Sequence, residues 1–121
     1  VRAVYRTIKA ALEAWSEDRL QGPLPETWRG FGERIAAATQ SACAGLPNDA
    51  IVLATSSGGA ISRGVADLLH APARAAIELN LQFRNSGFCE IFFSQRSMRL
   101  VSMNCVPHLD RGDRRDAITY S

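Results

Sequence analysis

The stretch from Ala50 to Ile61 constrains the fold of this chain more than any other. It consists of five apolar residues (Ala50–Ala54), three hydroxyl residues (Thr55–Ser57) and two glycines, after which a helical apolar pattern begins. The apolar run is too short for a helix and has no polar alternation, which is typical of a strand buried in a sheet covered on both faces. We therefore expect a buried strand, a glycine-rich turn and a helix in direct succession.

Apolar periodicity predicts further elements on both sides of this stretch. Apolar residues recur every three or four positions in the helical segments, which prolines and glycines interrupt. The expected order of elements is helix, helix, strand, helix and hairpin. This order predicts an α/β, three-layer fold with a partly antiparallel edge. We expect helices at residues 3–20, 28–42, 60–69 and 73–80 and strands at 50–54 and 88–95. Residues 96–104 should form a turn and a further strand, and the tail over 106–121 should wrap the surface.

Length and composition indicate one ordinary globular domain over residues 1–121, with 46% hydrophobic and 21% charged residues. The net charge is only +2, the arginines are scattered and aromatic residues make up 7%. A nucleic-acid surface normally shows a basic stripe with stacking side chains, so we expect no nucleic-acid partner. The chain has no apolar run of membrane-spanning length and no secretory signal, so we expect no membrane.

The cysteines and histidines give no sign of a disulfide framework or a metal centre. Cys43, Cys89 and Cys105 are odd in number and widely spaced, which favours buried, reduced thiols in a cytoplasmic protein. No pair among the cysteines and histidines has zinc-like spacing, and we expect no metal or cofactor. The chain also begins at Val1 within a helical pattern, which favours a piece of a longer polypeptide.

The residues Thr55 to Gly59 are the candidate site, because ligands of α/β sheets bind beyond the carboxyl ends of the strands. A helix that starts there presents free N–H groups and a positive dipole end to an anion, with hydroxyls of Ser56 and Ser57 as further donors. A purely structural alternative is a tight turn with Ser57 as the helix N-cap. The lysine of a P-loop, the G-x-G-x-x-G fingerprint and the G-x-S-x-G elbow are all absent.

The order of several motifs resembles the histidine phosphatase (phosphoglycerate mutase-like) superfamily. The second catalytic histidine of this superfamily lies in a motif of the type V-(S/T)-H-G-G-x-I. Residues Thr55–Ile61 align with this motif, and Ser57 occupies the position of the histidine. The segment from Pro25 to Ile35 resembles the family's G-E-(S/T) segment and its F-x-x-R helix. Residues 79–93 resemble the segment with an asparagine before the next strand. Residues 100–110 and 118–121 resemble the final strand and tail.

This resemblance implies a fold and a set of roles. The fold is a three-layer α/β/α domain with a mixed, mostly parallel sheet, of which the chain is the C-terminal portion without its N-terminal strand. Glu26 is then the catalytic acid or base, while Ser56, Ser57, Gly58 and Gly59 bind a phosphate oxygen of a small phosphomonoester. The family's nucleophilic histidine belongs to an R-H-G motif, which this chain lacks.

The leading hypothesis is therefore a phosphohydrolase-type domain whose nucleophile lies outside the chain, so that the chain alone is inactive. One alternative is a degenerate, non-catalytic domain that binds a phosphorylated ligand or a protein partner. Another is a truncated product that folds by pairing with a second copy, since exposed strand edges favour a homodimer. The sequence does not name a substrate and does not distinguish a mutase from a phosphatase.

Overall fold

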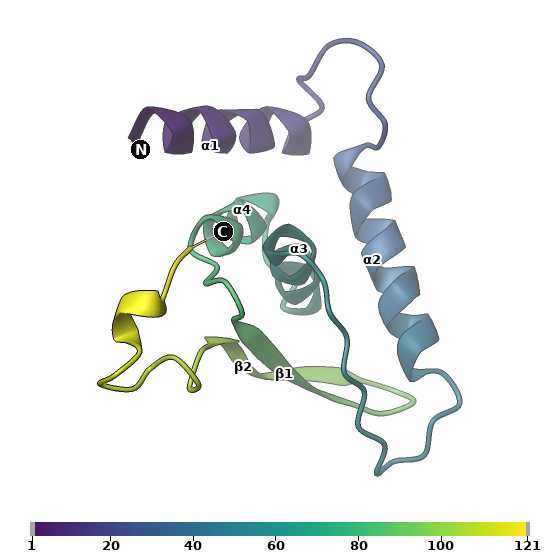
Figure 1. The fold of residues 1–121 in the computed structure, drawn as a ribbon. Coiled ribbons are helices and arrows are strands. Elements are labelled where there is room, and N and C mark those ends of the chain that lie inside the picture. Colours follow the sequence, from purple (N-terminus) through teal and green to yellow (C-terminus); the bar gives the residue numbers. More distant parts are fainter. Residues whose placement is uncertain (1, 121) are drawn as a thin grey trace.

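A computed structural model describes residues 2–120 and contains four helices and one antiparallel hairpin (Figure 1). The four expected helices and the expected hairpin are confirmed, with shifts of a few residues at their ends. The elements are α1 (Arg2–Ser16), α2 (Trp28–Cys43), α3 (Gly58–Leu68), α4 (Ala73–Leu81), β1 (Phe88–Phe93), β2 (Met98–Cys105) and a 3-10 turn (Arg115–Ala117).

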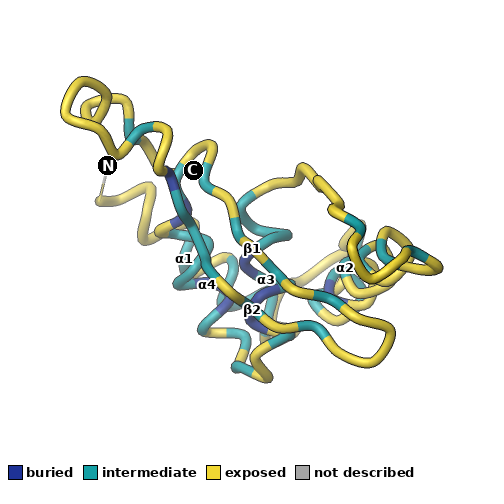
Figure 2. Tube along the Cα trace, turned by 90° about the horizontal axis from the view of Figure 1, so that it is seen from below, coloured by how far each residue is buried: buried dark blue, intermediate teal, exposed yellow. Residues whose placement is uncertain are grey.

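The core lies where α3 and α4 pack against each other and over the hairpin. Figure 2 shows that fully buried stretches are short and that exposed chain surrounds them. Helices α3 and α4 contribute two buried apolar residues each, because their apolar positions recur at helical spacing. The buried apolar residues are Val65, Ala66, Ala76, Ile77, Phe83 and Val106. This is a small core for a chain of 121 residues.

Helix α1 lies across α4 and meets the start of α2 through aromatic rings. Lys9 on α1 pairs with Glu78 on α4, and the ring of Trp15 lies edge-on to Trp28, with centroids 5.1 Å apart. Edge-to-face contacts of this kind stabilise beyond the area they bury. The helix has no fully buried residue, and Val4 remains 62% exposed. Its amphipathic pattern is therefore confirmed, but its apolar face is only partly covered.

The C-terminal part of the chain is tied to the start of the hairpin by hydrogen bonds. The side chain of Asn104 accepts from the Arg84 amide at 2.8 Å and donates to the Gln82 carbonyl at 2.9 Å. The Asn85 amide donates to the Thr119 carbonyl at 2.9 Å. The tail therefore runs along the surface, as expected, and closes on the loop between α4 and β1.

The expectation of a buried strand at Ala50–Ala54 is wrong. The segment is extended and belongs to no helix or strand, and the exposed fractions of Ile51 and Leu53 are 97% and 90%. A strand becomes buried only where neighbouring strands pair with it, and β1 pairs with β2 alone. The described residues thus form a two-stranded antiparallel sheet, and they do not form the three-layer, mostly parallel arrangement.

The three cysteines are free and only half-buried, so the expectation of full burial is wrong. Burial raises the pKa of the Cys89 thiol, and the neighbouring Cys105 adds to this, whereas a backbone hydrogen bond from Asn104 opposes it.

Along residues 2–120 there is no helix of the length and apolarity needed to cross a membrane.

Candidate functional site

The candidate site begins at the N-terminus of α3, where Ser57 is the N-cap. Its backbone is extended (φ −78°, ψ 156°), and its Oγ accepts a long bond from the Ala60 amide at 3.4 Å. Its carbonyl accepts from the Ile61 amide at 3.0 Å. The capping role is thus confirmed, and Ser57 retains hydroxyl capacity for a further partner because the 3.4 Å bond is weak.

Two backbone donors and two hydroxyls at this helix end are open. Among residues 2–120, the amides of Gly58 and Gly59 and the hydroxyls of Thr55 and Ser56 make no hydrogen bond. Thr55 and Ser56 are exposed, and both glycines are half-buried. Free N–H groups at a helix N-terminus, where the helix dipole is positive, bind anions. The local geometry is therefore that of a small anion site.

Asn80 on α4 lies beside the same helix end. A Cβ atom placed on Gly59 would lie 3.6 Å from Asn80 Oδ1, in ordinary van der Waals contact. Gly59 and Asn80 also border a cavity of about 80 Å³, whose other walls are apolar and aromatic. The sequence does not single out Asn80, because residues 79–93 contain two asparagines. The side chain of Asn85 is engaged elsewhere, because its Nδ2 donates to Thr119 Oγ1 at 2.9 Å.

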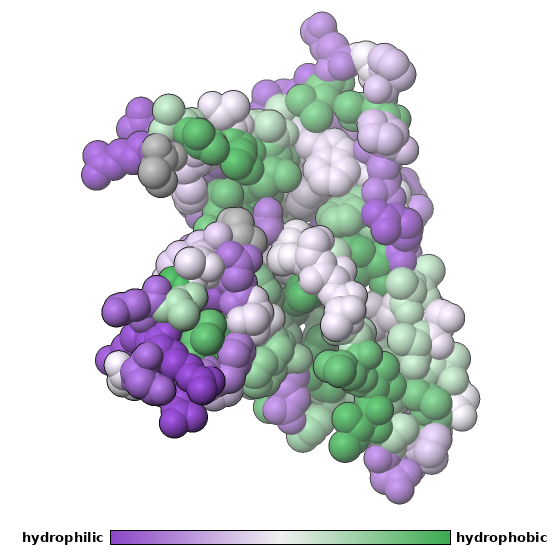
Figure 3. Space-filling model, in the orientation of Figure 1, coloured by the Kyte–Doolittle hydropathy of each residue, from purple (hydrophilic) through white to green (hydrophobic). Residues whose placement is uncertain are grey.

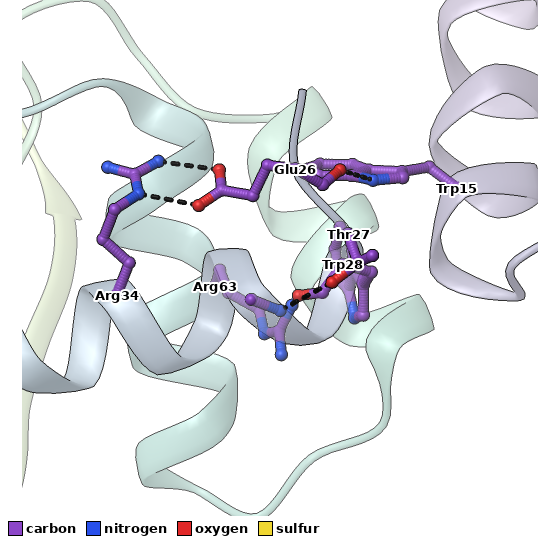
Figure 4. A network of polar contacts seen from close by, with 7 residues as sticks. Trp15, Glu26, Thr27, Trp28, Arg34 and Arg63 are labelled. Atoms are coloured by element: carbon purple, nitrogen blue, oxygen red, sulfur yellow. Dashed lines mark hydrogen bonds and ion pairs between the residues drawn. The ribbon is translucent and has the colours of Figure 1, made fainter. Parts of the chain in front are cut away.

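Glu26 lies in the loop before α2, and its carboxylate is held by Arg34. Arg34 Nε and Nη2 donate to the two carboxylate oxygens at 2.8 and 2.9 Å (Figure 4). The Glu26 carbonyl accepts from Trp15 Nε1 at 2.9 Å, so α1 and α2 together fix the loop. The hydrogen bonds from Arg34 lower the pKa of Glu26, against a smaller opposing effect of burial. The carboxylate is therefore ionised at neutral pH, which suits a base better than an acid.

The two parts of the expected site are not in direct polar contact. The polar contacts of Glu26 within the described chain are to Arg34 and Trp15, and none is to Ser56, Ser57 or the glycines. An aromatic cluster of Trp15, Trp28 and Phe31 joins them, because these rings line the small cavity that also borders Gly59. The structure therefore brings Ser56, Ser57, Gly58 and Gly59 together, whereas Glu26 makes no polar contact with them.

Two arginines stand out in the structure but have no role in the sequence-based site. Arg34 follows Phe31 by three residues, which puts both on one helix face, with the guanidinium 5.5 Å from the ring centre. Arg63 on α3 donates to the Trp28 carbonyl at 2.7 Å and lies 4.4 Å from the centre of the Trp28 ring. Arg63 also forms an ion pair with Asp67 at 2.8 Å. The i, i+4 spacing of these two residues is the one signal in the sequence that indicates a role for Arg63.

A shallow apolar groove runs along α1 next to the Glu26 loop. It has a volume of about 430 Å³ and is lined by Ile8, Ala11, Leu12, Trp15, Leu20, Leu24, Pro25 and Glu26. Because nearly all of its walls are aliphatic or aromatic, the groove fits an apolar group rather than a sugar or a charged group. It lies beside the one carboxylate of the candidate site.

Neither histidine belongs to this site. His70 follows α3 with a positive φ of 54°, at the other end of that helix from Ser57. His108 Nε2 lies 2.8 Å from Ser86 Oγ in the C-terminal part of the chain. Within residues 2–120 there is also no cluster of three His, Cys, Asp or Glu side chains that could hold a metal ion.

Comparison with known proteins gives the family of the chain. The family model of the histidine phosphatase superfamily (branch 1) matches residues 2–106. Because this match spans most of the sequence, the chain belongs to the histidine phosphatase superfamily, as its motifs predict. No curated protein and no solved structure matches the chain.

Proposed function

We propose that this chain is the C-terminal portion of a phosphohydrolase-type domain that binds a small phosphomonoester at the N-terminus of α3. The observation that carries the proposal is the pair of open amides at Gly58 and Gly59, flanked by free hydroxyls on Thr55 and Ser56. A dianionic phosphate fits such a donor set and the positive end of the helix dipole. Membership in the histidine phosphatase superfamily supports the same ligand class.

In this proposal the residues of the chain bind and orient the phosphate, and the nucleophile comes from outside the chain. The amides of Gly58 and Gly59 and the Ser57 hydroxyl hold one phosphate oxygen. Serine donates a hydrogen bond but does not bring the positive charge of a protonated histidine, so the phosphoryl group is stabilised less strongly. Neither His70 nor His108 takes the nucleophile's role, because neither lies at this helix end.

Glu26 acts as the base that removes a proton from the attacking water, in accordance with its lowered pKa. This role requires the Glu26 loop to approach the phosphate, which the pair with Arg34 opposes. When the Glu26 loop moves towards the phosphate, the apolar groove beside Glu26 comes within reach of the leaving group, and an aryl or other apolar phosphomonoester is therefore the favoured substrate class. The three-layer fold with its mostly parallel sheet belongs to the same proposal, since it needs further strands beside residues 50–56.

The second candidate is a non-catalytic domain that binds a phosphorylated ligand through the same helix end. The Glu26–Arg34 pair favours it, because both carboxylate oxygens are engaged by one guanidinium. The two candidates share the anion site and differ in the role of Glu26.

Phosphate binding is tested by titrating inorganic phosphate and phenyl phosphate into the isotope-labelled chain and following amide resonances by NMR. We expect shifts at Gly58, Gly59 and Ala60. Gly58→Pro removes one donor at the first helical position, where proline is well tolerated, and we expect it to weaken binding. Gly112→Ala, in the C-terminal part of the chain away from α3, is the control, because a Cβ atom there meets no other atom. Unshifted Gly58 and Gly59 amides at millimolar phosphate would rule out both candidates.

Catalysis is tested with a polypeptide that adds an R-H-G-bearing segment to the chain. We expect hydrolysis of an aryl phosphate that Glu26→Gln lowers by two orders of magnitude or more, about the contribution of a general base, while phosphate binding is retained. Unchanged hydrolysis in Glu26→Gln contradicts the assigned role, and no hydrolysis with intact phosphate binding favours the non-catalytic candidate. A faster Ser57→His variant would identify this position as part of the catalytic machinery.

A further inference from the structure

We propose that Ser86 and His108 form a nucleophile–base pair that reacts with small, activated carboxylic esters. The Oγ atom of Ser86 and the Nε2 atom of His108 lie 2.8 Å apart, although the two residues are 22 positions apart in the sequence. At this distance an imidazole nitrogen can take the proton of a serine hydroxyl and make it a nucleophile. Both residues are exposed, so a ligand can reach the hydroxyl from solvent.

Ser86 occupies a strained position in a tight turn. The Gly87 amide donates to the Arg84 carbonyl at 2.9 Å, which closes a four-residue turn with Ser86 in its third position. The backbone φ of Ser86 is 61°, and turns with a positive φ at this position normally have glycine or asparagine there. Strained residues of this kind cluster at functional sites, where a particular side chain is required. The strain therefore directs attention to the Ser86 hydroxyl.

Both partners are held in place by the body of the fold. The side chain of Asn104 ties the segment that carries Ser86 to the end of β2 through two hydrogen bonds, of 2.8 and 2.9 Å. The carbonyl of the core residue Val106 accepts from two amides of the turn that carries His108, at 2.8 and 2.9 Å. The backbone thus positions the hydroxyl next to the imidazole, and reacting groups that are already oriented react faster.

The reactive groups of the pair have no competing partner. Within residues 2–120, the Ser86 hydroxyl and the His108 imidazole make this one hydrogen bond and no ion pair, and the Ser86 amide donates to no acceptor. In serine hydrolases the amide of the nucleophile is one of the two donors that stabilise the oxyanion. The turn therefore offers a nucleophile, a base and one oxyanion donor. Because a single donor stabilises the oxyanion less than two, we expect reaction only with activated esters.

The reaction has two steps and returns both side chains to their starting state. The Ser86 oxygen bonds to the ester carbonyl carbon while its proton passes to His108 Nε2. The bond from that carbon to the aryl oxygen then breaks, and the proton moves to the departing aryl oxide. In the second step water gives a proton to His108 and attacks the acyl group, the serine C–O bond breaks, and the serine oxygen takes the proton back.

The surroundings of the pair favour a small, soluble ester. Figure 3 shows that the C-terminal segment after β2 forms a strongly hydrophilic surface, so water and short-chain esters have access to it. The proposed reaction uses neither the amides of Gly58 and Gly59 nor Glu26. It therefore does not depend on phosphate binding, and failure of one proposal leaves the other intact.

The test is incubation of the full 121-residue chain with excess p-nitrophenyl acetate, followed by release of p-nitrophenolate and by mass spectrometry after acid quenching. We expect release faster than the background and an acetyl group that peptide mapping assigns to Ser86. Ser86→Ala should abolish both, and His108→Gln should slow the release about a hundredfold or more, the contribution of a general base.

Ser86→Gly separates the hydroxyl from the fold. Glycine adopts a φ of 61° without strain, so this variant should keep its unfolding free energy close to that of the native chain and still lose the reaction. Release that persists in Ser86→Gly overturns the proposal. Acetylation confined to other residues also overturns it, because the hydroxyl is then not the nucleophile.

His70→Gln is the matched control for the imidazole, because His70 is also exposed and has a positive φ of 54°. It should remove only the background reaction of a free imidazole. Ser94→Ala is the control for the hydroxyl, since Ser94 is exposed in another turn and its hydroxyl contacts Ser97, and it should leave the rate unchanged. A native chain that releases p-nitrophenolate no faster than His108→Gln overturns the proposal.

Discussion

The guanidinium of Arg34 lowers the pKa of the candidate base Glu26 through two hydrogen bonds. Arg34→Met removes the hydrogen bonds and the positive charge, so we expect the pKa of Glu26 to rise towards its ordinary value of 4.5. NMR titration of the Glu26 side-chain carbonyl carbon measures this. Arg29→Met is the control, since Arg29 pairs with Glu33 on the exposed face of the same helix. An unshifted Glu26 in Arg34→Met contradicts the cause that we assign.

The same pair predicts a dependence of stability on pH. Because the pKa of Glu26 is lower in the folded chain than in the unfolded chain, its ionised form stabilises the fold above about pH 4.5. This contribution is lost as the pH falls through the folded pKa. The difference in unfolding free energy between the native chain and Arg34→Met should therefore shrink on acidification.

Ser62 on α3 is fully buried, and within the described chain its hydroxyl has no hydrogen-bond partner. Burying a hydroxyl without a partner costs about 1–3 kcal/mol. We therefore expect Ser62→Ala to raise the unfolding free energy by about 1 kcal/mol, measured by urea denaturation. Ser57→Ala at the N-cap of the same helix should have the opposite sign and cost about 0.5–1 kcal/mol, because it removes the capping hydroxyl. A destabilised Ser62→Ala would mean that the hydroxyl has a partner in solution.

At the scale of elements, α2 and α3 are held together at Gly32. A Cβ atom there would lie 2.1 Å from Arg63 Nη2 and 2.6 Å from its Cζ. Gly32→Ala therefore displaces a guanidinium that donates to the Trp28 carbonyl and pairs with Asp67. We expect a loss of about 1–2 kcal/mol of unfolding free energy, even though alanine favours the helix itself.

A double-mutant cycle with Arg63→Met tests the cause of this loss. Once the long guanidinium is gone, Gly32→Ala should cost much less, so the two substitutions should not be additive. Equal costs of Gly32→Ala in the two backgrounds would show that the new methyl group clashes with something other than Arg63.

Elements held by local periodicity could be predicted from the sequence, whereas those that depend on a distant partner could not. The helices follow from apolar residues three and four apart, and the hairpin from two strand patterns around a turn. The composition of Ala50–Ala54 is that of a buried strand, but burial depends on neighbouring strands, which no local window contains. Likewise, the capping role of Ser57 is local and was predictable, whereas the approach of Asn80 to Gly59 arises from the packing of α4 on α3.

At the scale of the whole molecule, stability rests on few side chains. Ile77 is 2% exposed and Ile51 is 97% exposed, so the same truncation should have very different effects. We expect Ile77→Ala to cost about 2–5 kcal/mol and Ile51→Ala to change the unfolding free energy by less than about 0.5 kcal/mol. Both are measured by denaturation at a concentration at which the chain is monomeric. Similar losses for the two variants would mean that Ile51 is buried in the folded monomer.

The contact of α1 with α4 has a consequence for the synthesis of the protein. Helix α1 has 15 residues, a length at which isolated helices are marginal in water, and its partner Glu78 lies near the end of α4. At translation rates of about 5–20 residues per second, roughly 3–13 seconds separate the synthesis of Ser16 from that of Leu81. During that interval α1 lacks the surface on which it docks, so its apolar face stays uncovered until α4 has been synthesised.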